Sequence, residues 1–215
     1  MIFVRFCDIC ETYKLKITMK KIWIVLAVIA VVILIVYSSV KGTYNNMVTM
    51  DESVSASWAQ VENVYQRRAD LIPNLVNTVK GYASHEKETL EGVIEARSKA
   101  TSVNINPENL NEQSLAQFQQ AQSGLSSALS RLMVVVERYP DLKANQSFLD
   151  LQAQLEGTEN RIAVERRKFN ESARSFNTYI RSFPKNIYAN LFGFEKKAYF
   201  EAEKGAEKAP EVSFD

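Results

Sequence analysis

The residues that could carry acid–base chemistry gather around His85, the one histidine of the chain. Glu86, Glu88 and Glu91 supply carboxylates that could orient an imidazole or exchange a proton with it. The sequence offers no second histidine and no cysteine after Cys10, so neither a metal-ligand set nor a nucleophile–base pair forms around His85. We therefore expect a structural or solvated histidine, with pH sensing, catalysis and metal binding as the alternatives.

The two cysteines, Cys7 and Cys10, have the spacing of a redox or zinc motif. Neither a βαβ context nor a second ligand pair accompanies them, so we interpret the pair as structural or accidental. The same basic segment, residues 1–21, contains Met19-Lys20-Lys21 directly before an apolar run. That start is typical of a membrane protein, and we expect residues 1–18 to be dispensable.

Charged residues also occur where a helical pattern predicts a core. Arg68 occupies an apolar seam position, and Arg67 and Asp70 lie beside it. A buried arginine without a carboxylate is costly, so we expect Arg68 to pair across the bundle with Glu159 or Glu165. The alternative interpretation is an anion or peptide site.

A basic patch, Arg166-Arg167-Lys168, follows directly after Glu165. Three consecutive side chains of a helix cannot all face a core, because they point in different directions around its axis. We expect a solvated, ion-paired face here. Binding of phosphate-rich groups or lipid headgroups is the alternative.

The elements that position these residues begin with a hydrophobic segment. From Ile22 to Val40 there are 19 residues without a charge, and thirteen of them are Ile, Leu or Val. A helix of that length spans about 28 Å, so residues 22–41 are predicted to cross a bilayer once. A cleaved signal peptide and a buried soluble helix are the alternatives. The apolar core exceeds the roughly 7–15 residues of export signals, and no clear small-x-small cleavage site follows it.

The charges beside this segment predict its direction. Lysines cluster before the span, whereas after Lys41 no basic residue occurs until Arg67. The positive-inside rule then leaves the N-terminus in the cytoplasm and the main domain outside it.

The rest of the chain has the pattern of an all-α domain. The whole chain contains only seven glycines and five prolines, too few for a turn-rich β fold. Apolar residues recur at helical spacing from residue 43 to about Ala100, with a bend or break expected near Asp70–Pro73. A loop is predicted at Thr101–Glu112, and a tight turn at Tyr139-Pro140-Asp141.

A second helix is predicted between that loop and that turn. The last long helix, of about 33 residues, keeps a heptad-like repeat of apolar residues until Phe183-Pro184 ends it. Long helices with short connections predict an elongated, antiparallel four-helix-bundle-like domain over residues 43–184. The seam positions of these helices are the predicted core: Val54, Trp58, Val61, Tyr65, Ile72, Leu75, Val79, Tyr82, Leu115, Phe118, Leu125, Leu129, Leu132, Val135, Val136, Phe148, Leu151, Leu155, Thr158, Ile162, Phe169, Phe176 and Tyr179.

Residues 185–202 form an aromatic C-terminal segment that we expect to dock on the bundle or, alternatively, to contact the membrane interface. Residues 203–215, with Pro210 and mixed charge, are expected to be a mobile tail. Apart from residues 1–21 and Lys41, the chain has 20 basic and 23 acidic residues. That balance argues against a nucleic-acid partner.

Many segments of the chain resemble the LemA family, over about residues 20–210. In the first half they are Tyr44-Asn45, Trp58, Arg67-Arg68-Ala69-Asp70-Leu71-Ile72-Pro73-Asn74-Leu75-Val76, Gly81-Tyr82, His85-Glu86 and Ala96-Arg97. In the second half they are Glu137-Arg138-Tyr139-Pro140-Asp141-Leu142-Lys143-Ala144-Asn145, Leu155-Glu156-Gly157-Thr158-Glu159-Asn160-Arg161-Ile162, Phe169-Asn170, Phe183-Pro184 and Phe192-Gly193-Phe194.

This resemblance implies a bacterial protein with one N-terminal membrane helix and a four-helix, bundle-like domain. It implies little about activity, because the family has no established enzymatic role. The residues themselves predict no catalytic residue, metal or cofactor. Some members of the family are linked to envelope stress, to a membrane metalloprotease, or to membrane shaping in magnetosome formation. The family is often described with its short N-terminus outside, whereas the lysines of this chain predict it inside.

We therefore expect a non-enzymatic, single-pass scaffold of the bacterial inner membrane. Its expected partners are the lipid bilayer, copies of itself and other membrane proteins, such as a membrane metalloprotease. The alternative is an extracytoplasmic four-helix sensory module that signals through a partner. The third interpretation is an enzyme. The sequence argues against it, because it shows no nucleophile–base pair, no phosphate-binding loop and no metal-ligand spacing.

Overall fold

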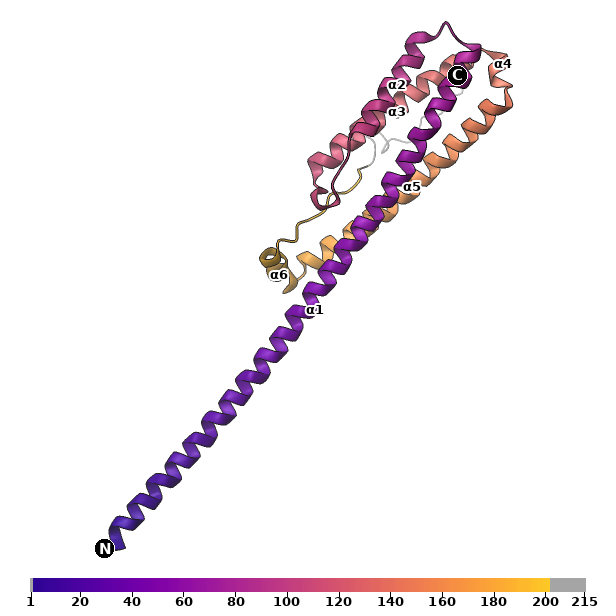
Figure 1. Ribbon diagram of the computed structural model, residues 1–215. Helices are drawn as coiled ribbons and strands as arrows, with labels where there is room; N and C mark the ends of the chain where they lie inside the picture. The colour runs from indigo at the N-terminus through magenta and orange to yellow at the C-terminus, as the bar shows by residue number, and fades with distance from the viewer. Residues whose placement is uncertain (1, 202–215) are drawn as a thin grey trace, which may run out of the picture. The chain divides into compact units, whose positions relative to one another are not determined.

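The computed structural model describes the backbone of residues 2–201 and the side chains of residues 23–107 and 109–201 (Figure 1). Within that range the order is α1 (Ile2–Tyr82), α2 (Lys87–Ser102), a 3-10 turn (Pro107–Asn109), α3 (Glu112–Val136), α4 (Pro140–Lys143), α5 (Gln146–Arg181) and α6 (Lys185–Phe192). No strand occurs in the described backbone, so the predicted all-α fold is confirmed. The chain divides into two compact units, Met1–Asn46 and Met47–Asp215.

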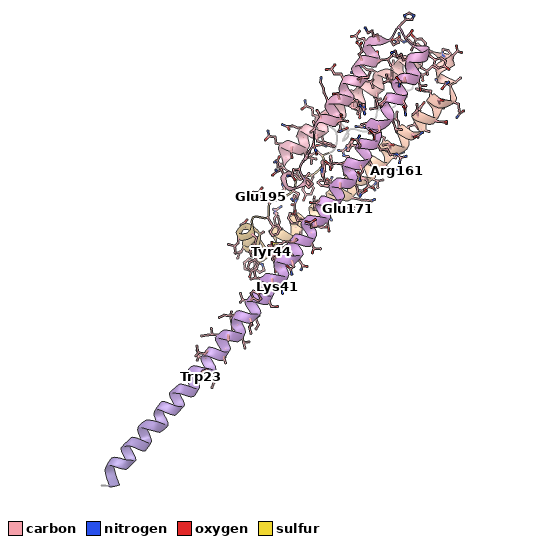
Figure 2. The ribbon with its side chains drawn as sticks, in the orientation of Figure 1. Trp23, Lys41, Tyr44, Arg161, Glu171 and Glu195 are labelled. Atoms are coloured by element: carbon pink, nitrogen blue, oxygen red, sulfur yellow. The ribbon has the colours of Figure 1, made fainter. Side chains whose placement is uncertain are left out.

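The first unit contains the apolar segment. Every large apolar side chain described between Trp23 and Tyr37 is exposed, and Trp23 projects freely from α1 in Figure 2. An 18-residue window of this stretch reaches a mean hydropathy of 2.8, long and apolar enough to cross a membrane. The predictions for the side chains of residues 1–21, Cys7 and Cys10 included, and for the tail 203–215 lie outside the described residues.

The second unit is built from four helices that run side by side, namely α1 from Met47 onward, α2, α3 and α5 (Figure 1). Asparagine side chains cap the N-termini of α3 and α5. The Asn111 side chain accepts a hydrogen bond from the Ser114 amide at the start of α3, and Asn145 does the same for Phe148 at the start of α5. Each cap satisfies an amide that the first helical turn would leave without a partner.

The core of this unit consists of two clusters. The aromatic cluster contains Met47, Val54, Trp58, Val61, Tyr65, Ile105, Leu110, Leu115, Phe118, Ile162, Phe169, Ala173, Phe176, Ile180, Ala189, Ala198 and Phe200. The aliphatic cluster contains Ile72, Leu75, Val76, Val79, Ala83, Leu90, Val93, Ala100, Leu125, Ala128, Leu132, Val136, Leu142, Phe148, Leu151 and Leu155. Most predicted seam residues are buried, whereas Tyr82 is exposed and Leu129 and Tyr179 are only partly buried.

Of the bend or break expected near Asp70–Pro73, the break was wrong, because α1 continues through Pro73 to Tyr82. Proline has no amide hydrogen, so the buried Ala69 carbonyl four residues earlier loses its usual donor. The Arg97 Nε of α2 donates to that oxygen at 2.7 Å instead. A side chain from the neighbouring helix therefore replaces the missing backbone bond.

The expected continuation of the first helix to about Ala100 was also wrong. The chain turns at Ala83–Glu86, where the Glu86 amide donates to the Ala83 carbonyl at 3.1 Å, and α2 begins at Lys87. Glu86 consequently precedes a helix and does not lie within one. Leu90 keeps the apolar spacing on the far side of the turn, so periodicity alone could not separate one long helix from a hairpin.

After α6 the chain runs back along α5 without regular structure, held by two asparagines seven residues apart. The buried Asn177 side chain donates to the Lys197 carbonyl at 2.8 Å and accepts from the Lys197 amide at 2.9 Å. Asn170 makes the same pair of bonds with Phe200, at 3.0 and 2.8 Å. These contacts seat Phe200 in the aromatic cluster.

Candidate functional site

A layer of polar side chains crosses the bundle at Arg68, which is only 2% exposed. Its Nη1 donates to Glu159 Oε2 at 3.0 Å and to Ser126 Oγ at 3.1 Å, and its Nη2 donates to Gln122 Oε1 at 2.6 Å. The expected pairing of Arg68 with Glu159 is confirmed. We call Arg68, Gln122, Ser126 and Glu159 the polar layer.

The polar layer separates the two clusters. On α1, Arg68 follows Tyr65 of the aromatic cluster and precedes Ile72 of the aliphatic cluster. Gln122 separates the clusters in the same way on α3, and Glu159 does so on α5. A buried, hydrogen-bonded charge fixes the register of the helices around it, because sliding any helix by one turn would leave the guanidinium without its partners.

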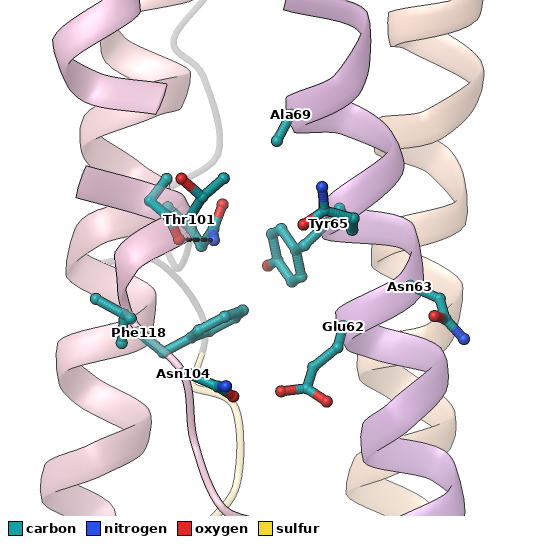
Figure 3. Close-up of a pocket in the computed structure, with 11 residues that line it drawn as sticks. Glu62, Asn63, Tyr65, Ala69, Thr101, Asn104 and Phe118 are labelled. Atoms are coloured by element: carbon teal, nitrogen blue, oxygen red, sulfur yellow. Dashed lines mark hydrogen bonds between the residues drawn. The ribbon is translucent and has the colours of Figure 1, made fainter. Parts of the chain in front are cut away.

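A cavity of about 290 Å³ adjoins the polar layer (Figure 3). In Figure 3, Glu62 and Tyr65 on α1 face Thr101, Asn104 and Phe118 across the cavity. Its remaining lining residues are Asn63, Gln66, Ala69, Ala100, Val103 and Gln122. The volume is close to the lower limit of small-molecule sites, about 300 Å³.

Two groups that line this cavity have pKa values above their ordinary ones. Burial raises the pKa of the Glu62 carboxyl, and the nearby indole N–H of Trp58 offsets part of that rise, although its geometry falls short of a full hydrogen bond. Burial is also the main cause that raises the pKa of the Tyr65 hydroxyl, partly opposed by the charges of Arg166 and Arg68. Tyr65 therefore remains a hydrogen-bond donor at neutral pH. With Glu62 as acceptor, the cavity suits a small polar or cationic molecule.

His85 lies in the turn between α1 and α2, and it is exposed. Its neighbour Glu86 contacts the α3–α4 connection: Tyr139 Oη donates to Glu86 Oε1 at 3.1 Å, and Arg138 Nη2 lies 3.0 Å from the same oxygen. Glu86 thus ties the α1–α2 turn to the α3–α4 connection. Among the side chains that the structure describes, no group of three or more His, Cys, Asp or Glu is arranged to hold a metal ion.

The basic patch Arg166-Arg167-Lys168 divides between different contacts. Lys168 Nζ pairs with Glu165 Oε1 at 2.8 Å, and Arg167 is exposed. Arg166 lies over the Phe200 ring, with its guanidinium carbon 4.8 Å from the ring centroid, and donates to the Glu201 carbonyl at 2.9 Å. Sequence reasoning missed this role, since nothing in the local pattern shows that residues 200 and 201 return to α5.

A groove of about 590 Å³ runs along the surface between α2 and α3. Its lining includes the small residues Gly92 and Ala96 on α2 and Ala121 and Gly124 on α3, and Glu95, Lys99 and Arg131 contribute charge. A Cβ atom added at Gly92 or Gly124 would meet nothing within 4 Å. The signal in the sequence was the spacing of these small residues by four on α2 and by three on α3, which places each pair on one helical face.

An all-α bundle that carries one exposed apolar segment long enough to span a membrane defines a membrane-associated helical protein. The sequence profile of the LemA family matches residues 57–214, and the chain belongs to that family.

Three relatives illustrate the similarity. The magnetosome protein MamQ of Magnetospirillum gryphiswaldense is 30% identical over 188 residues, which cover 79% of this chain and 68% of the relative. The magnetosome protein MamQ 1 of Paramagnetospirillum magneticum is 29% identical over 187 residues, with the same two coverages of 79% and 68%. Protein LemA of Metamycoplasma hominis is 25% identical over 161 residues, which cover 75% of this chain and 70% of the relative. None of these names states an enzymatic activity.

Proposed function

We propose that the protein is a non-enzymatic, membrane-anchored docking protein of the bacterial envelope. The apolar segment of α1 anchors it, and the bundle presents a surface on which a helix of another membrane protein or of a second copy docks. The single observation that carries the docking role is the groove between α2 and α3.

The composition of the groove supports a helical occupant. Gly92, Ala96, Ala121 and Gly124 leave room for a backbone to approach closely, which is how small residues act at packed helix interfaces. An exposed glycine inside a helix costs about 1 kcal/mol relative to alanine. The open space at Gly92 and Gly124 shows that packing within this chain does not require glycine at either position, and in the groove that space is available to an occupant.

A photocrosslinking experiment in native membranes tests this proposal. A photoreactive phenylalanine at Gln117, which lines the groove, should give a covalent adduct with a partner, and mass spectrometry should identify that partner. The substitution Gly124→Phe should abolish the adduct because it fills the groove. Gly157→Phe is the matched control, since Gly157 is also an exposed helical glycine with open space around it, on α5.

The expected result is an adduct that Gly124→Phe removes and Gly157→Phe preserves. Absence of any adduct, or an adduct that survives Gly124→Phe, would overturn the docking role of the groove.

The lysines before the span support an orientation with the bundle outside the cytoplasm. Alkaline phosphatase fused to the C-terminus, which is active only outside the cytoplasm, should be active. An inactive phosphatase together with an active cytoplasmic reporter at the same position would reverse the orientation.

The cavity beside the polar layer favours a second candidate function, a sensory module that binds a small polar or cationic ligand and signals through a membrane partner. Small amines and polar metabolites should then raise the melting temperature of the full chain in detergent. Glu62→Gln should weaken that shift by removing the acceptor. If no compound shifts the melting temperature, the sensory reading loses its support while the docking role stands.

A further inference from the structure

The face of α6 carries large apolar side chains that the bundle does not cover. Ile187 and Leu191 lie four residues apart on the same side of α6, and they are 56% and 74% exposed. Phe183, in the turn before α6, is 81% exposed. Three neighbouring apolar side chains with this exposure in a short stretch mark a contact surface. We call Phe183, Ile187 and Leu191 the α6 face.

The stretch of chain that contains the α6 face carries charge of one sign. From residue 172 to residue 194 the chain has no acidic residue, and it contains Arg174, Arg181 and Lys185. Figure 2 labels Glu171 and Glu195, the acidic residues on either side of this stretch. An apolar face whose stretch of chain carries only cations suits a surface that offers both hydrocarbon and negative charge.

Only a few residues separate the hydrophobic segment from the aromatic cluster along the chain. Ala189 of α6 packs in the aromatic cluster with Ile180 of α5 and Met47 of α1. Met47 follows Val40, the last apolar residue of the predicted span, by seven residues. Even a fully extended chain of seven residues reaches no further than about 25 Å. The intervening residues 41–46 include Lys41 and no acidic residue.

We propose that the α6 face lies in the surface of an anionic bilayer, with Ile187 and Leu191 at the boundary of the acyl chains and with Arg181 and Lys185 at the lipid phosphates. This inference rests on the membrane anchorage in the proposed function. It assigns α6 a second membrane contact that orients the bundle on the lipid. A second copy is a poorer occupant, since a stable protein interface needs about 800 Å² on each partner and the α6 face is three side chains wide.

A fluorescent reporter in the full chain tests this contact. Cys7 and Cys10 are replaced by serine, and an environment-sensitive dye is attached at Leu191→Cys. The matched control carries the dye at Val134→Cys on α3, which is 69% exposed and remote from α6 in the sequence. Both chains are reconstituted at one copy per lipid nanodisc of phosphatidylcholine with phosphatidylglycerol. Lipids with a spin label near the headgroup serve as quenchers.

The dye at residue 191 should shift to the blue and be quenched several-fold more strongly than the dye at residue 134. Omitting phosphatidylglycerol or adding Ile187→Asp should reduce that quenching, whereas Val134→Asp should not. Equal, weak quenching at the two positions would overturn the inference. A blue shift that appears only with several copies per disc would overturn it in favour of a second copy. In both cases a chain that stays in the disc keeps its anchorage, so this failure is distinct from failure of the proposed function.

Discussion

The two halves of the bundle core are closed in different ways. The aliphatic cluster is enclosed by helices, with Leu90, Val93 and Ala100 of α2 packed against α1, α3 and α5. The aromatic cluster receives no described residue of α2, and its fourth side is formed by Ile105 and Leu110 of the α2–α3 connection and by the segment around Phe200.

This difference shows why rings gather in one half. Side chains on an irregular backbone cannot interdigitate as closely as side chains on regularly spaced helices. Larger, aromatic side chains therefore fill the space. Trp58 lies at the centre, with ring centroids 5.2 Å from Phe118 and 5.6 Å from Phe169 in edge-on contact. Phe200 stacks on Trp58 at 6.0 Å. The aromatic half therefore depends on a few rings, whereas the aliphatic half depends on many small contacts.

The largest effect should follow from removing the central ring. Trp58→Ala should cost about 3–5 kcal/mol of unfolding free energy and release the segment around Phe200 to proteases. Leu132→Ala in the aliphatic cluster should cost about 2–5 kcal/mol without releasing that segment. Denaturant titration and limited proteolysis of the full chain in detergent measure both. If proteases cut the segment around Phe200 equally in the two variants, the aromatic cluster does not hold that segment more than the aliphatic cluster does.

The next effect concerns Asn177 and Asn170, whose hydrogen bonds hold the segment around Phe200 and which we call the asparagine clamps. Asn177→Ala leaves the Lys197 amide and carbonyl without partners in a buried position, so it should cost about 2–3 kcal/mol. Asn170→Ala should cost less because Asn170 is only partly buried. Hydrogen exchange at the amides of residues 197 and 200 reports each clamp separately. Unchanged exchange at residue 197 in Asn177→Ala would contradict the clamp.

In the aliphatic half, the bond from Arg97 to the Ala69 carbonyl should be worth about 1–2 kcal/mol, and only while Pro73 is present. Arg97→Met should destabilise the wild-type chain and cost less in a Pro73→Ala background, because alanine restores the backbone donor to Ala69. A double-mutant cycle by denaturant titration measures this coupling. Additive effects of the two substitutions would show that Arg97 does not replace the missing bond.

Between the halves, the polar layer should contribute more to register than to stability. Arg68→Met removes the buried charge and should change the unfolding free energy by within about 1 kcal/mol. Glu159→Ala leaves that charge buried with only Gln122 and Ser126, and should cost about 1–2 kcal/mol because Glu159 itself is exposed. A large loss in Arg68→Met with none in Glu159→Ala would reverse this order.

The smallest effect is the pH dependence of Glu62. Its pKa is raised in the folded state, so the charged carboxylate opposes folding above that pKa, and the penalty vanishes once both states are protonated. Glu62→Gln should therefore stabilise the chain at pH 7 by no more than about 0.5 kcal/mol, since solvent screens the half-buried group. The gain should disappear below about pH 4. Stability curves of the two chains that stay parallel across this range would contradict the assignment.

Periodicity predicted most of the core because burial in helices repeats every three to four residues. It placed Phe148, Ile162 and Phe169 on one seam of α5, and it placed Arg68 where only an acidic partner could balance it. The all-α class followed from the same pattern. These features depend on local spacing, which a single sequence displays directly.

The remaining features depend on contacts between distant residues. Pro73 was expected to bend or break α1, and the sequence could not show that Arg97, on a different helix, supplies the donor that keeps the helix continuous. The turn at Ala83–Glu86 was missed because the apolar spacing continues across it. Asn170 and Asn177 gave no signal on their own, since their partners lie 20 to 30 residues later in a segment without regular structure.

The central claim is that the apolar segment holds the bundle at a membrane, and alkaline carbonate extraction of cell membranes tests it most directly. The full chain should stay in the membrane pellet, whereas a chain with lysine at both Ile29 and Ile33 should move to the supernatant, because charge at the centre of a span costs about 2.5–3.5 kcal/mol per residue. A wild-type chain that carbonate releases into the supernatant would contradict the account.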